Sequence, residues 1–382
     1  MGKRHQLKEL EEEVKKTKIS GKQEQITEIE EEIKRTKYNK ATQKHIGALK
    51  AKLAKLRQEA QKTSGGPQGL GYGIKKSGDA TVVLVGYPSV GKSTILNKLT
   101  DAKSKVAHYE FTTLEVVPGI MELNGAKIQV LDVPGLIEGV SAGKGRGKEV
   151  LSVVRVADLI VYVLDNKDPE RKIKVMKREL YESGFRINQH PPDVKIEKKS
   201  MGGISVESTV KLTKTSIDEI KSIANTFGIH NADVLIRNDI TADEFIDVVL
   251  GNRTYAPMII LLNKTDLMRE EEVEMFCRKN NVIPISADKG ENIEDLKNNI
   301  WKTLGLIRIF LKKIGKEPDM KEPLVLRKNS TIEDVCTTIH RMFKDRFTFA
   351  RLWGPSAKFP GQKIGPEKKL QDNDIVELHI KK

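Results

Sequence analysis

The chain has 382 residues, of which 38% are hydrophobic and 31% are charged, with a formal net charge of +14. No apolar run approaches the roughly 18 residues of a membrane span, and the charged first residues do not resemble a signal peptide, so we expect a cytoplasmic protein without membrane contact. Two widely separated cysteines, Cys277 and Cys336, argue against a disulfide framework and give no evidence of a zinc site.

The positive charge is concentrated at the two ends of the chain. Residues 1–62 and residues 306–382 each carry 17 Lys and Arg against 10 Asp and Glu, while residues 63–305 are balanced. Basic flanks around a neutral centre favour contact with a polyanion, for which RNA is the first candidate. Solubilising charge on exposed helices is the alternative.

Residues 1–62 have the periodicity of amphipathic helices, with breaks at Ser20-Gly21 and Tyr38-Asn39. They predict a basic helical N-terminal region of two or three helices, followed by a glycine-rich linker. The apolar positions at helical spacing are Leu7, Leu10, Val14, Ile26, Ile29, Ile33, Ile46, Leu49, Leu53 and Leu56.

A phosphate loop is predicted where residues 86–94 match G-x-x-x-x-G-K-[ST] between an apolar strand at 81–85 and a helical pattern. Glycines let backbone N–H groups surround a phosphate, and the helix N-terminus adds positive potential. Lys92 is predicted to reach the β- and γ-phosphates, and the Ser93 hydroxyl to bind Mg²⁺. An ordinary glycine turn is the alternative. The predicted phosphate-binding residues are Gly86, Tyr87, Pro88, Ser89, Val90, Gly91, Lys92, Ser93 and Thr94.

A second motif, Asp132-Val133-Pro134-Gly135, ends the apolar run at 128–131. A carboxylate at the end of a strand can hold Mg²⁺ through water, as Asp132 would here. The N–H of Gly135 can approach a γ-phosphate because no side chain blocks it. We therefore expect the metal and the γ-phosphate to lie beside this motif.

Two further motifs predict selection of a guanine base. Asn263-Lys264-Thr265-Asp266 follows the buried strand at 258–262, and an Asp266 carboxylate can accept both N–H groups on the guanine edge. Adenine cannot supply that pair of donors. Ser286-Ala287 follows the run at 282–285, where a backbone N–H can meet the guanine oxygen. Together with the phosphate loop upstream, these motifs predict a guanine-nucleotide site.

The remaining segments predict two smaller modules. Residues 165–257 are too many for one crossover helix, so we expect a small α+β insertion at 172–240. The tail at 306–382 has a strand-strand-helix-strand order typical of a β-grasp fold. Phe347, Phe349 and Trp353 in this tail can stack on bases beside Arg346 and Arg351, although a core position is preferred for the phenylalanines.

These motifs resemble those of the translation-factor-like GTPases, and Tyr109-Glu110-Phe111-Thr112-Thr113-Leu114 resembles switch I of their Obg branch. Arg351-Leu352-Trp353-Gly354 narrows the resemblance to the developmentally regulated GTP-binding proteins (DRG family). The resemblance implies an α/β P-loop GTPase domain at 63–171 and 241–305, with a mostly parallel sheet and helices on both faces. It also implies a C-terminal TGS domain at 306–382. The matching switch I residues are Phe111, Thr112 and Thr113, of which Thr113 would bind Mg²⁺ in the GTP state.

The resemblance implies hydrolysis of GTP to GDP and phosphate, with catalytic roles for Lys92, Thr113, Asp132 and Gly135. The residue after D-x-x-G is Leu136, which cannot orient water by hydrogen bonding, so slow intrinsic hydrolysis is expected. Some relatives use K⁺ held by an Asn at the position of Ser89. We expect a switch acting in translation through ribosome or RNA contacts and a dedicated protein partner. The alternative is an RNA-binding or ribosome-binding scaffold whose nucleotide site is mainly structural.

Overall fold

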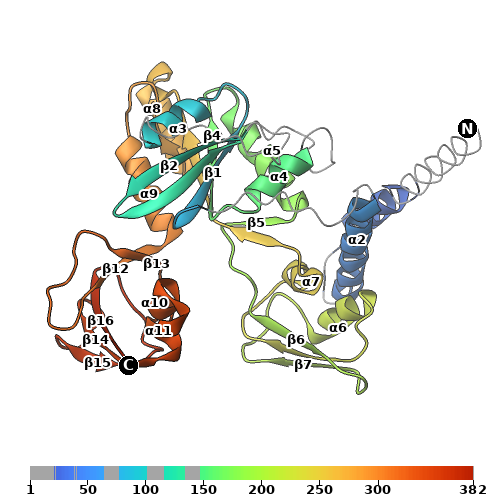
Figure 1. The fold of residues 1–382 in the computed structure, drawn as a ribbon. Helices are drawn as coiled ribbons and strands as arrows, with labels where there is room; N and C mark the ends of the chain where they lie inside the picture. The colour runs from blue at the N-terminus through green and yellow to red at the C-terminus, as the bar shows by residue number, and fades with distance from the viewer. Residues whose placement is uncertain are drawn as a thin grey trace, which may run out of the picture. The chain divides into compact units, whose positions relative to one another are not determined.

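The computed structural model describes residues 21, 23–37, 39, 41–63, 77–100, 116–133 and 147–381 (Figure 1). These residues belong to two compact units, one within residues 1–70 and 190–254 and the other within residues 71–189 and 255–382. The boundaries therefore differ from those expected for the insertion, which were 172 and 240. The first unit also includes the described N-terminal helices, which we predicted as a separate region.

The second unit contains a six-stranded sheet with the strand order β11-β10-β4-β1-β3-β2. Neighbouring strands are parallel except for β2 and β3, which form a hairpin at one edge. This hairpin turns at Asn124-Gly125, where both residues have positive φ angles, as the Asn-Gly dipeptide predicts. The strands are β1 (Ala80–Gly86), β2 (Val117–Leu123), β3 (Ala126–Asp132), β4 (Leu159–Leu164), β10 (Met258–Leu262) and β11 (Ile283–Pro284).

Helices cover both faces of this sheet. Helices α3 and α9 pack on one face, and α4, α5 and α8 pack on the other. Strands β1 and β4 are buried along their whole length, which explains why their sequences are continuously apolar. The predicted P-loop GTPase fold is confirmed. The helices are α3 (Lys92–Leu99), α4 (Gly147–Val154), α5 (Pro169–Glu182), α8 (Glu270–Asn280) and α9 (Ile293–Leu304).

The C-terminal domain has a five-stranded sheet with the order β13-β12-β16-β14-β15 and a β-grasp arrangement. It contains more elements than the predicted strand-strand-helix-strand order. The helix predicted near Ser330 begins after Thr331, whose hydroxyl and amide form a capping box with Asp334. The elements are β12 (Leu306–Leu311), β13 (Leu324–Arg327), α10 (Ile332–Ile339), α11 (Arg341–Asp345), β14 (Phe347–Trp353), β15 (Gln362–Ile364) and β16 (Asp374–Ile380).

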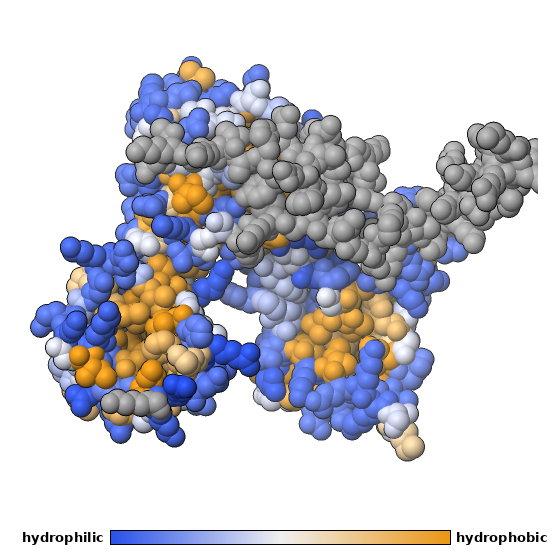
Figure 2. All heavy atoms as spheres, in the orientation of Figure 1, coloured by the Kyte–Doolittle hydropathy of each residue, from blue (hydrophilic) through white to orange (hydrophobic). Residues whose placement is uncertain are grey.

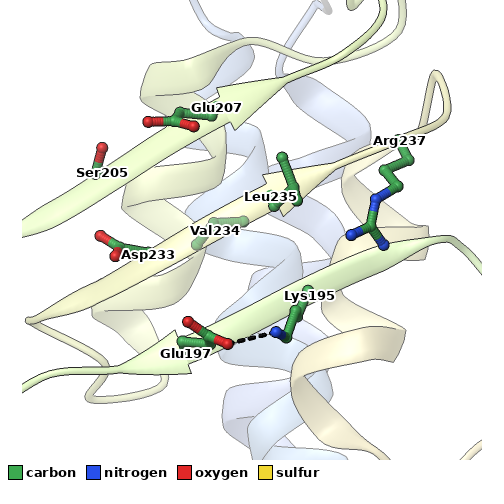
Figure 3. A pocket seen from close by; sticks show the side chains of 8 residues that line it. All are labelled: Lys195, Glu197, Ser205, Glu207, Asp233, Val234, Leu235 and Arg237. Atoms are coloured by element: carbon green, nitrogen blue, oxygen red, sulfur yellow. Dashed lines mark ion pairs between the residues drawn. The ribbon is translucent and has the colours of Figure 1, made fainter.

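The first unit combines a helical pair with a three-stranded sheet ordered β6-β8-β7. A helix over residues 23–35 is followed by α2 (Gln43–Thr63), with a break near Asn39 as predicted. Helices α6, α7 and α2 contribute to the core on one face of the sheet. Figure 3 shows charged side chains on the other face, including the ion pair between Lys195 and Glu197. The elements are β6 (Val194–Lys198), β7 (Ile204–Ser208), α6 (Ile217–Thr226), β8 (Ala232–Ile236) and α7 (Ala242–Leu250).

Strands β5 (Phe185–Ile187) and β9 (Thr254–Ala256) pair where the chain leaves the GTPase domain and returns to it.

Both cysteines are buried, and burial raises the pKa of each thiol. On the face seen in Figure 2, hydrophilic residues cover much of the described surface. No helix within the described ranges is both long and apolar enough to cross a membrane.

Candidate nucleotide-binding site

The phosphate loop lies between the end of β1 and the start of α3, and two glycines permit its path. Gly86 has φ +157°, and a Cβ added there would lie 2.4 Å from the carbonyl oxygen of Val163. Gly91 has φ +96°, and a Cβ there would lie 2.2 Å from Nδ2 of Asn263. Only glycine fits either position without displacing backbone or a buried side chain. The glycine spacing in the sequence therefore has a direct steric cause.

Lys92, the first residue of α3, is held inside this loop. Its side chain is only 8% exposed, and Nζ donates to the carbonyl oxygens of Gly86 at 3.3 Å and Tyr87 at 3.2 Å. Burial lowers the pKa of the Lys92 ammonium group, and the nearby charge of Asp132 opposes this effect. The loop thus orients one cation beside the N-terminus of a helix, which is an arrangement suited to phosphate.

Two oxygen atoms that could coordinate a metal ion, one of Ser93 and one of Asp132, lie close to each other near Lys92. The Ser93 hydroxyl donates to Oδ2 of Asp132 at 2.6 Å, so the second residue of α3 contacts the last residue of β3. Hydroxyl and carboxylate oxygens are ligands that Mg²⁺ binds, directly or through water. The residues present therefore fit the predicted metal. Within the described ranges, no group of three His, Cys, Asp or Glu side chains could hold a metal ion.

Asn263 joins the phosphate loop to the base-recognition segments. Its side chain is 2% exposed; Nδ2 donates to the carbonyl oxygen of Val90 at 2.8 Å, and Oδ1 accepts from the N–H of Ala287 at 3.0 Å. Three motifs that are far apart in the sequence are thus connected by one amide. Lys264 adds a contact from Nζ to the carbonyl oxygen of Ser89 at 2.9 Å.

The carboxylate predicted to read the base is exposed at the start of a short 3₁₀ turn, Thr265–Leu267. Oδ1 of Asp266 accepts a hydrogen bond from the Ser286 hydroxyl at 2.8 Å. The Thr265 hydroxyl donates to the carbonyl oxygen of Ile285 at 3.0 Å. These two bonds tie the Asn-Lys-Thr-Asp motif to the Ser-Ala motif, so both sit at one edge of the sheet.

A cavity of about 320 Å³ lies between these segments. Asp288, which also lines the cavity, was not predicted, although it directly follows the Ser286-Ala287 motif. Val133 is 1% exposed and packs in the core, away from this lining. The predicted residues Phe111, Thr112, Thr113, Pro134 and Gly135 lie outside the described ranges. The cavity is lined by Ser89, Gly91, Lys92, Ser93, Thr94, Asn263, Lys264 and Asp288.

Three family models together match most of the chain. A family described as a 50S ribosome-binding GTPase matches residues 81–198, and the C-terminal region of that family's domain matches residues 201–306. The TGS domain family matches residues 307–380. Among solved structures, a GTP-binding protein from Pyrococcus horikoshii OT3 is similar, with a TM-score of 0.44 and 15% identity over 79% of this chain and all of that chain.

Relatives with high sequence identity span nearly the whole chain. An uncharacterized GTP-binding protein of Methanocaldococcus jannaschii is 54% identical over 100% of this chain and 94% of its own length. Developmentally-regulated GTP-binding protein 1 of Xenopus laevis is 45% identical, and developmentally-regulated GTP-binding protein 2 of Homo sapiens is 44% identical. Each alignment covers 89% of this chain and 94% of the relative. A guanine-nucleotide site, a P-loop GTPase domain and a TGS domain thus occur in one chain, which belongs to the family of developmentally regulated GTP-binding proteins.

Proposed function

We propose that this GTP-binding protein hydrolyses GTP to GDP and phosphate, and that it acts as a molecular switch in translation or ribosome function. The observation that carries the proposal is that Lys92, Ser93 and Asn263 line one cavity, while Asp132 accepts a hydrogen bond from Ser93. The Asn263 amide, through its contacts with Val90 and Ala287, links the proposed phosphate-binding loop to the proposed base-selecting segments.

The described residues support distinct parts of such a reaction. Lys92 and the loop N–H groups would offset negative charge on the β- and γ-oxygens as the terminal phosphoryl group leaves. Ser93 would hold Mg²⁺ directly and Asp132 would hold it through water. Mg²⁺, when bound there, supplies charge neutralisation across the β- and γ-phosphates. From the family resemblance, Thr113 and Gly135 are proposed to sense the γ-phosphate and to release the switch segments after hydrolysis.

We expect the unassisted rate to be slow, because Leu136 stands where Ras-like enzymes place a water-orienting Gln. A hydrogen-bonding group must then come from elsewhere. A ribosome or a dedicated protein partner would supply it in trans. Alternatively, K⁺ would assist, although Ser89 replaces the Asn that some relatives use to hold that ion.

Two features support a role at the ribosome. The family matched by residues 81–198 is described as a 50S ribosome-binding GTPase, and the two basic ends provide charge for RNA contact. A cytoplasmic location follows from that role. The second candidate function is an RNA-binding scaffold with a structural nucleotide site, which the balance of charge in residues 63–305 and the basic ends also fit.

GTP turnover in Na⁺ and in K⁺, with and without ribosomes, tests the proposal. We expect slow turnover that ribosomes accelerate and that Lys92→Ala abolishes. Tight GTP binding with no turnover under any of these conditions would favour the scaffold. A second test concerns the base. Asp266→Asn should weaken the binding of GTP and strengthen the binding of xanthosine triphosphate, because the Asn amide can donate to the oxygen that xanthine carries in place of the guanine amino group. Unchanged GTP affinity in that variant would contradict the guanine assignment.

A further inference from the structure

Behind the phosphate loop, the ends of β1 and β4 bring together two segments that share no sequence motif. These strands are parallel neighbours, with Gly86 in register with Val163. Tyr87 follows β1, and Asp165 follows β4, so both residues emerge at the same edge of the sheet. Lys172 reaches this edge from the first turn of α5.

The Lys172 side chain contacts both of these residues. Its Nζ lies 2.5 Å from Oδ1 of Asp165 and 5.2 Å from the centroid of the Tyr87 ring. The Lys172 and Asp165 side chains are only 17% and 13% exposed, so water screens their attraction less than at the surface. A cation over an aromatic face is also attracted by the ring, more strongly where water is excluded.

The backbone at Lys172 is fixed as well. The hydroxyl of Tyr162, which is fully buried, donates to the carbonyl oxygen of Lys172 at 3.1 Å. Burial raises the pKa of this phenol, with Tyr87 and Asp165 adding to the effect, so the hydroxyl stays a donor across the physiological range. By contrast, Lys174 and Lys177 on the same helix are exposed. In the first turn of α5, therefore, both the backbone and the side chain of Lys172 are held by buried contacts.

Tyr87, whose ring lies under the Lys172 ammonium group, also contacts Lys92 of the phosphate loop. The carbonyl oxygens of Gly86 and Tyr87 accept hydrogen bonds from Nζ of Lys92. The Cα of Tyr87 carries both the ring that Lys172 contacts and the carbonyl group that Lys92 contacts. A contact that holds the ring therefore also restrains the position of this Cα and of the acceptor for the Lys92 ammonium group.

We propose that Lys172 is a positioning residue of the nucleotide site. Paired with Asp165, it clamps the ring of Tyr87 and so holds the carbonyl groups that aim Lys92 at the β-phosphate. The clamp acts on binding of GDP as well as GTP, so it does not depend on the proposed hydrolysis or on a ribosomal role.

Affinity for a fluorescent GDP analogue, measured by titration of the full-length protein, tests this assignment. We expect Lys172→Met to weaken binding about five- to tenfold, because a partly buried cation–ring contact and its ion pair are lost. Lys172→Arg should retain most of the affinity, since a guanidinium can pair with Asp165 and stack on the ring. Lys174→Met, an equal loss of charge at an exposed position of α5, should bind like the wild type.

A double-mutant cycle distinguishes positioning from general destabilisation. Tyr87→Leu removes the ring, and we expect its loss of affinity to be no greater when Lys172→Met is added. Additive losses would overturn the proposal, and so would wild-type GDP binding by a folded Lys172→Met protein. If Lys172→Met does not fold, Asp165→Asn in an otherwise intact chain decides the matter. That variant should weaken GDP binding severalfold at unchanged circular dichroism, and unchanged affinity would refute the clamp.

Discussion

Replacing Asn263 by Ala should destabilise the GTPase domain even without nucleotide. The amide bridges the carbonyl oxygen of Val90 and the N–H of Ala287, and these residues are 0% and 1% exposed. Alanine leaves one buried acceptor and one buried donor without that partner, each worth roughly 1–3 kcal/mol. Because water entering the space recovers part of this loss, we expect the free energy of unfolding to fall by about 2–4 kcal/mol.

Urea unfolding followed by tryptophan fluorescence measures this effect. The chain has two tryptophans, so a Trp353→Phe background leaves Trp301, in helix α9, as the reporter of the GTPase domain. Nucleotide is removed beforehand, because a bound ligand adds its own stabilisation. The denaturant dependence should stay unchanged, so that the shift in midpoint reports stability alone.

Lys264→Ala is the matched control. Lys264 also contacts the phosphate loop, through Nζ and the carbonyl oxygen of Ser89, but this contact is exposed. We expect it to cost less than about 0.5 kcal/mol. If Asn263→Ala lost no more stability than Lys264→Ala, the amide would not be a structural link, and its role would be limited to the bound nucleotide.

Three other substitutions test separate parts of the chain. Glu219 is fully buried, and burial raises its carboxyl pKa above the ordinary 4.5, so the folded state binds a proton that the unfolded state has lost between pH 4.5 and the raised pKa, and stability falls as the pH rises through that range. Glu219→Gln should therefore gain stability relative to the wild type at pH 7 but not at pH 4, in urea titrations at both pH values. Arg308 contacts Asp372 through Nε at 3.1 Å and Nη2 at 2.7 Å, and Arg308→Ala should destabilise the C-terminal domain by about 1 kcal/mol, monitored by Trp353 fluorescence. Gly91→Ala places a Cβ 2.2 Å from Nδ2 of Asn263, so GDP binding should weaken at least about tenfold; wild-type affinity would contradict the steric argument.

The nucleotide site shows how much local chemistry can predict. A phosphate loop needs glycine where the backbone has φ +96° and little space, as at Gly91, so its pattern is readable without a structure. Helix starts are equally local: the Ser216 hydroxyl accepts from the N–H of Glu219, and Thr241 forms a capping box with Glu244. Such signals lie within a few residues of the group that they satisfy. The strand, loop and helix order predicted around residues 81–94 depends on signals of this kind, and β1 and α3 follow that order.

Contacts between distant segments could not be predicted in this way. Helix α2 packs against α6, with Ala51 in the core of the unit that contains residues 190–254, although its own sequence shows only an apolar stripe. An apolar stripe must be buried, but nothing in it specifies the partner. The Lys172–Tyr87 contact has the same origin, because it exists only where β1 and β4 are neighbours.

Residues within single motifs therefore predict a phosphate loop, a carboxylate at a metal site and an Asp that binds the base. Which motifs lie side by side depends on how the domain packs: the Asn263 amide contacts Val90 and Ala287, which are 173 and 24 residues away in the sequence. The interactions that set local structure and those that set packing differ in range. Steric and capping preferences act between chain neighbours, whereas burial of apolar surface is non-directional and selects its partners only when the whole domain packs.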